Sequence, residues 1–215
     1  MRGRGSSRSS ASGWPSVLGD DWVTCPRCSG PLARGVRGGV ERPTCPACGF
    51  VFFANPGVGA ACVIRDPAGR VLLVQRAPGQ FGAGRWCFPC GYVEWGEDVR
   101  AAAAREALEE AGVAVTLGDV VHVASNFHDP AKPSVGVWFA ATPTDPGATP
   151  VAGDDAVAVG WFDPAAPPPL AFPTDLDLLR RLADQGSRAV SATSAPWAAA
   201  SSGVRKRSKG RSRPR

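Results

Sequence analysis

A 23-residue stretch, residues 91–113, restricts the fold of this chain more than any other part of its sequence. A glycine-containing loop leads into a segment rich in alanine and glutamate, and a glycine follows it, which predicts a helix over 98–111. On that helix Glu106, Glu109 and Glu110 are spaced i, i+3 and i+4 and therefore share one face. Carboxylates with few counter-charges are the ligands that hard cations such as Mg²⁺ and Mn²⁺ prefer. The stretch therefore predicts a helix that carries a metal site.

A solvated charged face is the alternative explanation for these glutamates. Such a face usually carries interleaved lysine or arginine, and here only Arg105 is adjacent. Glu97, at the start of the helix, is favoured by the helix dipole and is expected to pair with Arg105. The side opposite the glutamates is expected to pack into the domain, and it carries Ala101, Ala104, Leu108 and Ala111.

The long middle segment, 54–185, alternates apolar and β-branched runs with turn residues, which predicts several strands. Residues 57–66 and 70–76 flank a Pro-Ala-Gly turn and indicate a hairpin. Leucines at helical spacing predict a second helix over 173–185. Strands mixed with two helices imply an α/β domain built in layers. Further strands are expected over 86–93, 113–123, 134–141 and 157–162.

Four cysteines stand before this segment in two C-x2-C units, separated by 16 residues. This spacing is typical of paired zinc knuckles, and free buried thiols are the alternative. Four thiolate ligands leave no open coordination position, so the Zn²⁺ would be structural. We expect a small zinc ribbon over 21–53, held by Cys25, Cys28, Cys45 and Cys48.

A third C-x2-C unit, formed by Cys87 and Cys90, lies within an expected strand. Positions three apart in a strand point to opposite faces, so these thiols are expected to diverge and to pack in the interior. A redox pair or a metal site is the alternative. Cys62 is expected to be a small core residue.

The net charge of +5 comes from the ends of the chain. Residues 1–10 and 201–215 hold ten Arg and Lys residues and no acid, which leaves 14 basic and 19 acidic residues elsewhere. A basic, nucleic-acid-binding core is therefore not expected. The ends, 1–20 and 186–215, are predicted to be disordered basic arms. Without a long apolar run, a secretory signal or an even number of cysteines, a cytoplasmic location is expected.

The resemblance to a known family lies in the same stretch, which is similar to the Nudix box, G-x5-E-x7-R-E-U-x-E-E-x-G-U. The chain from about residue 21 to 185 resembles bacterial Nudix hydrolases with an N-terminal zinc ribbon, often described as ADP-ribose pyrophosphatases. The resemblance implies the Nudix fold, an α/β/α sandwich with a mixed sheet, over 54–185, preceded by the ribbon. The fixed positions of the box are Gly91, Glu97, Arg105, Glu106, Glu109, Glu110 and Gly112.

The resemblance also implies roles for individual residues. Glu97 and Arg105 would tie the loop to the helix. Asp155, next to Asp154, stands where the family has a further acidic residue, but its shorter side chain leaves its role as ligand or base open. The catalytic Mg²⁺ or Mn²⁺ would be held by Glu106, Glu109, Glu110 and the backbone carbonyl of Cys90. The catalytic set expected on this basis is Glu97, Arg105, Glu109, Glu110 and Asp155.

The activity implied is hydrolysis of a nucleoside diphosphate linked to another moiety, giving a nucleoside monophosphate and a second phosphorylated product. A carboxylate, Glu109 or Asp155, would accept a proton from the attacking water. ADP-ribose is the first expected substrate, then FAD, then NADH, because only a Phe-Pro pair of the NADH pyrophosphatase signature is present. Arg76 and Arg85 are the candidates for binding phosphate, and the favoured alternative is that each is an ordinary surface arginine. The aromatic candidates for stacking on a base or flavin are Phe81, Trp95, Phe127 and Trp138.

Two other functions stay open. A non-catalytic Nudix module would bind nucleotide metabolites as a sensor, although the intact glutamate cluster favours an enzyme. A zinc-ribbon protein would bind nucleic acid, and the seven positive charges in 201–215 suit weak phosphate contacts. The expected partners are a small-molecule nucleotide, a second copy of the chain in a homodimer, and nucleic acid at the basic tail, with no membrane.

Overall fold

The computed structural model describes residues 22–129 and 132–193. The predicted arm over 1–20 and the tail from 194 onward lie outside these residues. None of the helices in the described ranges is long and apolar enough to span a membrane. In chain order the elements are β1 (Ala33–Arg37), β2 (Val40–Thr44), β3 (Gly57–Ile64), β4 (Val71–Arg76), β5 (Trp86–Cys87), β6 (Cys90–Tyr92), α1 (Val99–Ala111), β7 (Val115–Asn126), β8 (Ser134–Pro143), β9 (Ala156–Phe162) and α2 (Pro173–Thr193).

The strands of the larger domain form two sheets. One has the order β6-β3-β8-β7 and is mixed, because β3 and β8 run parallel while the other pairs are antiparallel. The other is antiparallel, with the order β5-β4-β9. The prediction that β3 and β4 pair with each other as a hairpin is therefore wrong. The turn between them forms, but both edges of each strand are occupied by other partners, so they meet only at the Arg65–Val71 bridge.

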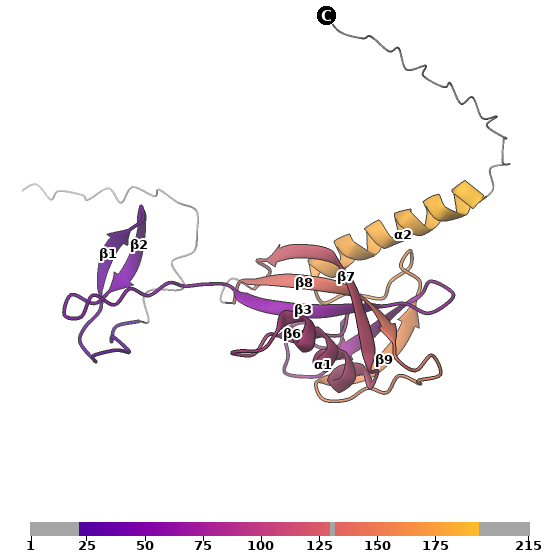
Figure 1. Ribbon diagram of the computed structural model, residues 1–215, viewed down its shortest axis with the longest axis horizontal. Helices are drawn as coiled ribbons and strands as arrows, with labels where there is room; N and C mark the ends of the chain where they lie inside the picture. The colour runs from indigo at the N-terminus through magenta and orange to yellow at the C-terminus, as the bar shows by residue number, and fades with distance from the viewer. Residues whose placement is uncertain (1–21, 130–131, 194–215) are drawn as a thin grey trace, which may run out of the picture.

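Two hydrophobic clusters lie on opposite sides of these strands because side chains alternate along a strand. In β3, Cys62 and Ile64 belong to the first cluster, while Ala61 and Val63 belong to the second. Helix α1 covers the first side and α2 the second, and Figure 1 shows the two helices on opposite sides of the strands. The predicted α/β/α arrangement with a mixed sheet is thus confirmed.

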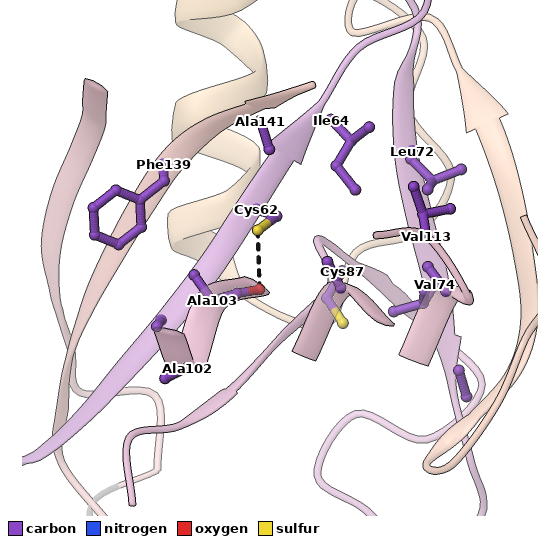
Figure 2. Close-up of a cluster of buried hydrophobic side chains, with 14 of the residues drawn as sticks. Cys62, Ile64, Leu72, Val74, Cys87, Ala102, Ala103, Val113, Phe139 and Ala141 are labelled. Carbon is purple, nitrogen blue, oxygen red and sulfur yellow. Dashed lines mark hydrogen bonds between the residues drawn. The ribbon is translucent and has the colours of Figure 1, made fainter. Parts of the chain in front are cut away.

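The interior of the first cluster is built from small and branched side chains, which Figure 2 shows around Cys62. Cys62 is fully buried, as expected of a core residue, and its thiol donates to the carbonyl oxygen of Ala103 in α1 at 3.0 Å. Burial raises the pKa of this thiol to about 12, so it stays protonated. The contact ties the middle of β3 to α1.

The single strand predicted over 86–93 is divided into β5 and β6, which belong to different sheets. The buried pair Phe88 and Pro89 separates them, and proline cannot donate a ladder hydrogen bond. The chain therefore passes from one sheet to the other at this point. This crossing brings Gly91 in β6 next to α1.

Helix α1 has the predicted ends but not the predicted packing face. Asp98 is the N-cap, and Gly112 ends the helix with a φ of 65°, in the left-handed region that glycine adopts readily. Of the side expected inside, Leu108 is 55% exposed, and only Ala111 is buried. The residues that are buried are Ala102, Ala103, Glu106, Ala107, Glu110 and Ala111. Two of the three clustered glutamates therefore lie on the packed side of the helix.

Helix α2 continues beyond its predicted end. The leucine spacing predicts 173–185, whereas the helix ends at Thr193. The helix therefore includes residues 186–193, which the sequence assigned to the tail. A helix can continue here because Gly186 alone does not end it and no proline follows before Pro196.

Candidate active site

Arg105 ties the loop before α1 to the helix. Its Nε and Nη2 donate to the carboxylate of Glu97 at 2.9 and 3.1 Å, and Nη2 also donates to the carbonyl of Tyr92 at 3.1 Å. The same carboxylate accepts from the backbone amide of Glu94 at 2.9 Å. These hydrogen bonds, the one from Arg105 first, lower the pKa of Glu97 to about 2. The expected pair of Glu97 and Arg105 therefore forms and closes the loop.

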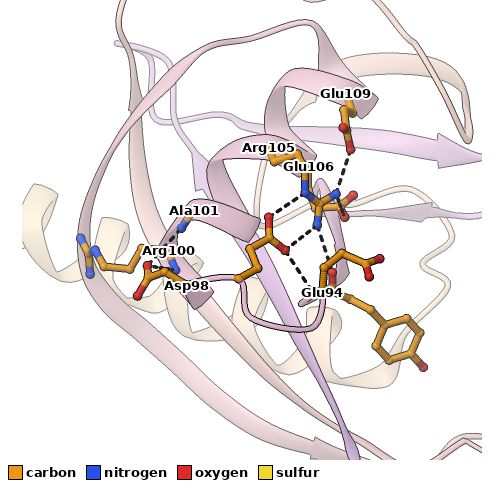
Figure 3. A network of polar contacts seen from close by, with 9 residues as sticks. Glu94, Asp98, Arg100, Ala101, Arg105, Glu106 and Glu109 are labelled. Atoms are coloured by element: carbon orange, nitrogen blue, oxygen red, sulfur yellow. Dashed lines mark hydrogen bonds and ion pairs between the residues drawn. The ribbon is translucent and has the colours of Figure 1, made fainter.

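Arg105 is also the counter-charge for two of the clustered glutamates. Its Nη1 lies 2.6 Å from Glu106 Oε1 and 2.9 Å from Glu109 Oε2. One guanidinium nitrogen thus bridges two carboxylates (Figure 3). Because these contacts are ion pairs, positive charge is stabilised at the point between the two glutamates. The guanidinium of Arg105 therefore offsets part of the negative charge of these two glutamates.

Glu106 lies against the backbone of β6. A Cβ atom built on Gly91 would overlap the carboxyl group of Glu106, so only glycine leaves room for this side chain. Glu106 is 8% exposed, and burial raises its pKa. The box glycine therefore allows a carboxylate to approach the sheet edge closely.

Glu110 is held at the same edge. It is 5% exposed, and its Oε2 accepts from the backbone amide of Cys90 at 2.8 Å. Burial raises its pKa to about 7, with smaller contributions from neighbouring carboxylates. Cys90 is positioned by the antiparallel pairing of β6 with β3, in which it faces Ala61. The charged form of Glu110 therefore has little solvent around it and depends on its protein neighbours.

The loop before β9 brings two further carboxylates to this site. Backbone amides of 151–153 donate to the last carbonyls of α1 at 2.9 and 3.2 Å, which fixes the path of the loop. Asp154 follows with a φ of 48°, unusual outside glycine, and both Asp154 and Asp155 are exposed. Asp154 interacts electrostatically with Glu106, and Asp155 with Glu110. The loop thus adds negative charge to the edge where the glutamates lie.

Comparison with known proteins decides the family. The NUDIX domain profile matches residues 55–182, which is more than half of the chain. The chain belongs to the Nudix family. The matched residues fall within the segment 54–185 that the sequence indicated. The family resemblance of the box and the fold inferred from it are thereby confirmed.

Three curated Nudix relatives match shorter segments. The NAD-capped RNA hydrolase NudC of Stutzerimonas stutzeri is 34% identical over 105 residues, which is 47% of this chain and 36% of the relative. The RNA pyrophosphohydrolase of Dinoroseobacter shibae is 48% identical over 59 residues, 27% of this chain and 36% of the relative. The CTP pyrophosphohydrolase of Escherichia coli is 44% identical over 64 residues, 30% of this chain and 46% of the relative. The chain therefore spans less than half the length of each.

Solved Nudix structures agree with the fold. A Nudix hydrolase from Nitrosomonas europaea aligns with a TM-score of 0.66 and 28% identity, over 77% of this chain and 92% of that one. A MutT Nudix hydrolase from Burkholderia pseudomallei aligns with a TM-score of 0.51 and 29% identity, over 59% of this chain and 98% of that one. These neighbours carry the name hydrolase, as the sequence resemblance led us to expect.

The Nudix glutamates have the chemistry that a divalent cation needs. Oxygen ligands of Glu106 and Glu109 already hold one cationic group, the guanidinium of Arg105, and Glu110 is buried beside them. The carboxylate oxygens of the three do not lie within 4.8 Å of one another in the arrangement described, where only the cysteines form such a group. A metal bound to all three would therefore have to displace Nη1 of Arg105.

The four N-terminal cysteines converge. Their sulfur atoms lie within 4.8 Å of one another, with 3.6 Å between Cys25 and Cys48 and 3.5 Å between Cys28 and Cys45. Tetrahedral zinc with Zn–S bonds of about 2.3 Å places its sulfurs about 3.8 Å apart, so this geometry fits Zn²⁺. The backbone amide of Cys48 lowers the pKa of the Cys45 thiol to about 7, while contacts with the neighbouring thiols raise that of Cys28 to about 12, so the two share a proton between them. The predicted group of four ligands is thus brought together.

Both cysteine knuckles close in the same way. Each has a residue with positive φ directly after its second cysteine, Ser29 at 58° and Gly49 at 74°. The intervening hairpin of β1 and β2 turns at Gly38 and Gly39, which also have positive φ, as a tight hairpin requires. The local turn chemistry therefore positions the four sulfurs.

The prediction that the Cys87 and Cys90 thiols diverge is wrong. The two thiols interact, and this contact, followed by burial, raises the pKa of Cys90 well above its usual range. The alternation of a strand does not apply, because Pro89 breaks the strand between them. Both cysteines border the hydrophobic core.

The sequence did not predict one buried carboxyl group, that of Asp175. Asp175, near the start of α2, is 1% exposed, and its two oxygens accept from the Phe88 amide at 3.3 Å and from Trp138 Nε1 at 3.1 Å. Burial raises its pKa to about 7. Trp138 is buried by the same contact, so it is not available to stack on a ligand. An acidic residue in the first turn of a helix was the only sequence signal, and it indicates exposure as readily as burial.

A cavity of about 560 Å³ lies on the other side of the sheet from the glutamates. Residues of β3, β7, β8 and α2 line it, among them Arg65 and Arg181. None of the predicted site residues lines this cavity. Its position therefore separates it from the carboxylates of α1.

Proposed function

We propose that this Nudix protein is a Mg²⁺-dependent pyrophosphohydrolase, for which Mn²⁺ is the alternative ion. It cleaves a nucleoside diphosphate joined to another moiety, giving a nucleoside monophosphate and a second phosphorylated product. The observation that carries the proposal is the buried Glu110 beside Glu106 and Glu109, which already share a cationic group. Diphosphate esters are anionic, so a site that gathers cations suits them as substrates.

The residues at the site have three separate roles: metal binding, positioning and proton acceptance. Glu106, Glu109, Glu110 and the carbonyl of Cys90 hold the metal, which when bound offsets phosphate charge and lowers the pKa of water. Glu97 positions Arg105, which is available for phosphate oxygens once it leaves the glutamates. The proton acceptor comes from the exposed carboxylates, Glu109, 44% exposed at its side chain, or Asp155.

The substrate belongs to the nucleoside diphosphate derivatives. ADP-ribose stays the first choice, followed by FAD and NADH, and all three carry the same adenosine diphosphate group. The similarity to an NAD-capped RNA hydrolase adds NAD-capped RNA to the set that must be tested. We keep the ADP-ribose preference because the sequence after the box has only the Phe-Pro pair of the NADH signature.

The cysteine segment, 21–53, is proposed to be a structural zinc ribbon separate from the Nudix domain over 54–185. The convergence of four sulfurs supports it. A reducing, cytoplasmic location would keep these thiols available to the metal. Homodimer formation and nucleic-acid contact by the tail remain predictions.

One experiment tests the enzymatic proposal. Purified protein with Mg²⁺ is incubated with ADP-ribose, FAD, NADH and NAD-capped RNA, and the products are separated by chromatography. Glu109→Gln and Glu110→Gln should each reduce kcat by at least about a hundredfold, because each removes a metal-binding charge. The fold should persist, since Gln at position 110 can still accept from the Cys90 amide.

The matched control is Glu41→Gln, which alters an exposed glutamate in β2 and should leave turnover unchanged. Full activity of both Glu109→Gln and Glu110→Gln would contradict the site assignment. Absence of cleavage of every diphosphate tested, with metal bound, would instead favour a nucleotide sensor.

A further inference from the structure

Three aromatic rings from separate parts of the chain meet beside the end of β4. Phe81 lies in the loop after β4, His128 follows β7, and Phe172 directly precedes α2. The centroid of the His128 ring lies 4.9 Å from that of Phe81 and 5.0 Å from that of Phe172. The two phenylalanine rings are nearly parallel, with centroids 6.0 Å apart and an interplanar angle of 8°. We name these three residues the aromatic cluster.

Arg76 connects the aromatic cluster to the glutamate site. Its guanidinium carbon lies 5.1 Å from the centroid of Phe172, and its Nε donates to the carbonyl of Phe81 at 2.7 Å. Arg76 also interacts electrostatically with Glu110. It is the last residue of β4 and pairs with Ala156, directly after Asp155. One cation thus lies between the rings and the carboxylates.

The backbone holds the aromatic cluster in place. The loop after β4 is closed by hydrogen bonds from the amide of Arg76 to Arg85 at 3.0 Å and from the amide of Gly84 to Arg76 at 2.9 Å. Gly82 has a φ of 71°, and a Cβ there would lie 2.8 Å from the Cβ of Ala171. The loop is therefore packed closely against the residue before Phe172. The rings are arranged before any ligand arrives, which lowers the entropic cost of binding.

The aromatic cluster opens to solvent at Phe81, whereas His128 and Phe172 are half-buried and Phe172 packs against the first hydrophobic cluster. Phe81 is 47% exposed, whereas Trp138 is 4% exposed and bonded to Asp175. Burial lowers the pKa of His128, so its ring is neutral at pH 7 and Arg76 supplies the positive charge here. The exposed ring of Phe81 next to a cation offers a stacking surface and a phosphate contact together.

We infer that Phe81, His128 and Phe172 bind the aromatic base of the substrate, while Arg76 binds the phosphate attached to that nucleoside. This inference rests on the proposed function and makes it more specific. The base lies at the end of β4, Arg76 holds the adjoining phosphate, and the diphosphate extends from there towards Glu110. Of the two arginines considered from the sequence, Arg76 is the phosphate ligand. Of the four aromatic candidates, Phe81 is the one used, with Phe172 and His128 added.

Binding of two product fragments tests this assignment without requiring turnover. AMP carries a base and a phosphate, whereas ribose 5-phosphate lacks the base, and both are titrated into the full chain with Mg²⁺ by calorimetry. Phe81→Leu and Phe172→Leu should weaken AMP binding on the order of tenfold and leave ribose 5-phosphate binding unchanged, because only stacking is lost. Arg76→Gln should weaken AMP binding more than ribose 5-phosphate binding, because Arg76 is assigned the phosphate of the nucleoside and ribose 5-phosphate carries the other phosphate of ADP-ribose.

Steady-state kinetics provide the second measurement. With ADP-ribose, Phe81→Leu should raise KM on the order of tenfold while kcat stays within about twofold, because the ring contributes to binding and not to the chemical step. Phe81→Tyr retains a ring and should restore the KM. Thermal unfolding of Phe81→Leu should match the parent, because the side chain is half exposed.

Trp95→Leu tests the rival stacking candidate, a fully exposed aromatic residue outside the aromatic cluster, and Phe53→Leu, at an exposed ring before the Nudix domain, is the matched control that should bind AMP as the parent does. Loss of AMP affinity in Trp95→Leu but not in Phe81→Leu or Phe172→Leu would overturn the inference. Unchanged AMP affinity in all three would overturn it as well, even with turnover intact. Failure of the proposed function is recognised separately, as AMP binding that depends on Phe81 without cleavage of any diphosphate.

Discussion

At the scale of single residues, the site is defined by carboxyl groups placed where water cannot fully solvate them. Glu110 and Asp175 are both buried with a pKa of about 7, yet their surroundings differ. Glu110 accepts from the Cys90 amide and lies beside further carboxylates, as a cation site requires. Asp175 accepts hydrogen bonds from one backbone amide and one indole, which is an arrangement that stabilises the fold. A raised pKa therefore identifies burial, and the neighbours decide between binding and structure.

Gly91→Ala should destabilise the protein by about 1–3 kcal/mol, because the added Cβ overlaps the carboxyl group of Glu106 and forces it away. Activity should fall with it. Gly59→Ala is the control, since Gly59 pairs with the adjacent residue of β6 and its Cβ would meet only ordinary contacts, the nearest at 3.6 Å. Urea denaturation measures the free energy of unfolding of both variants. Equal stability of the two variants would show that Glu106 does not occupy the space at Gly91.

Asp175 should make stability depend on pH. Its pKa rises from 3.8 in the unfolded chain to about 7 when folded, so the folded protein holds an extra proton between these values. The resulting stabilisation is complete below pH 3.8 and is lost as pH rises through 7. The stability of the parent relative to Asp175→Asn should therefore fall by up to about 1.4 kcal/mol per pH unit between pH 5 and 7.

Thermal or urea unfolding across that pH range provides the measurement. Asp177→Asn is the control, because Asp177 is an exposed residue on the same helix and should leave the slope unchanged. A parent protein and an Asp175→Asn variant with identical pH profiles would mean that Asp175 titrates normally in the folded state.

At the scale of elements, helix α1 joins the loop, the sheet and the carboxylates. It packs through small alanines, which let its backbone approach β3 closely enough for the Cys62 to Ala103 hydrogen bond. The same close approach buries Glu106 and Glu110. The helix therefore positions its acidic residues through its packing and is held at its start by a side-chain cap.

Asp98→Ala should destabilise the protein by about 1 kcal/mol, since Asp98 Oδ1 accepts from the amides of Arg100 at 2.9 Å and Ala101 at 3.2 Å. Asp98→Asn retains an acceptor of similar strength and should lie within a few tenths of a kcal/mol of the parent. Denaturant midpoints measure the difference. An equal loss of stability in both variants would show that the negative charge of Asp98, and not its hydrogen bonds to the helix amides, stabilises the protein.

At the scale of the whole molecule, two units are stabilised in different ways. The domain around the two sheets has two hydrophobic clusters, and neither contains any of the described residues 22–53. That N-terminal segment has four converging thiols in place of a core. We propose that a segment this small needs a metal to fold, because it buries too little apolar surface.

Cys25→Ser should lower the zinc content from about one ion per chain to far less, because three thiolates bind zinc more weakly than four. Inductively coupled plasma mass spectrometry measures the zinc content per chain. The Nudix domain should still unfold cooperatively, because its clusters do not include the ribbon. Cys62→Ala, which changes a cysteine outside the group, should keep the full zinc content, and equal loss in both variants would place the metal elsewhere.

The sequence alone was sufficient for the features that depend on local spacing. The capped helix, the Glu97 and Arg105 pair and the two cysteine knuckles follow from distances of a few residues along one element, where geometry is nearly invariant. The layered class and the family likewise followed from patterns that repeat along the chain.

Only the tertiary structure decided which groups from distant segments meet. The buried side of α1, the separation of β3 from β4 and the contact of Cys87 with Cys90 depend on how the sheets close around Pro89. The meeting of Phe81, His128 and Phe172 beside Arg76 also depends on three loops that converge from different sheets and helices. Periodicity reports which faces an element has, but the partner that covers each face is set by packing across the whole chain.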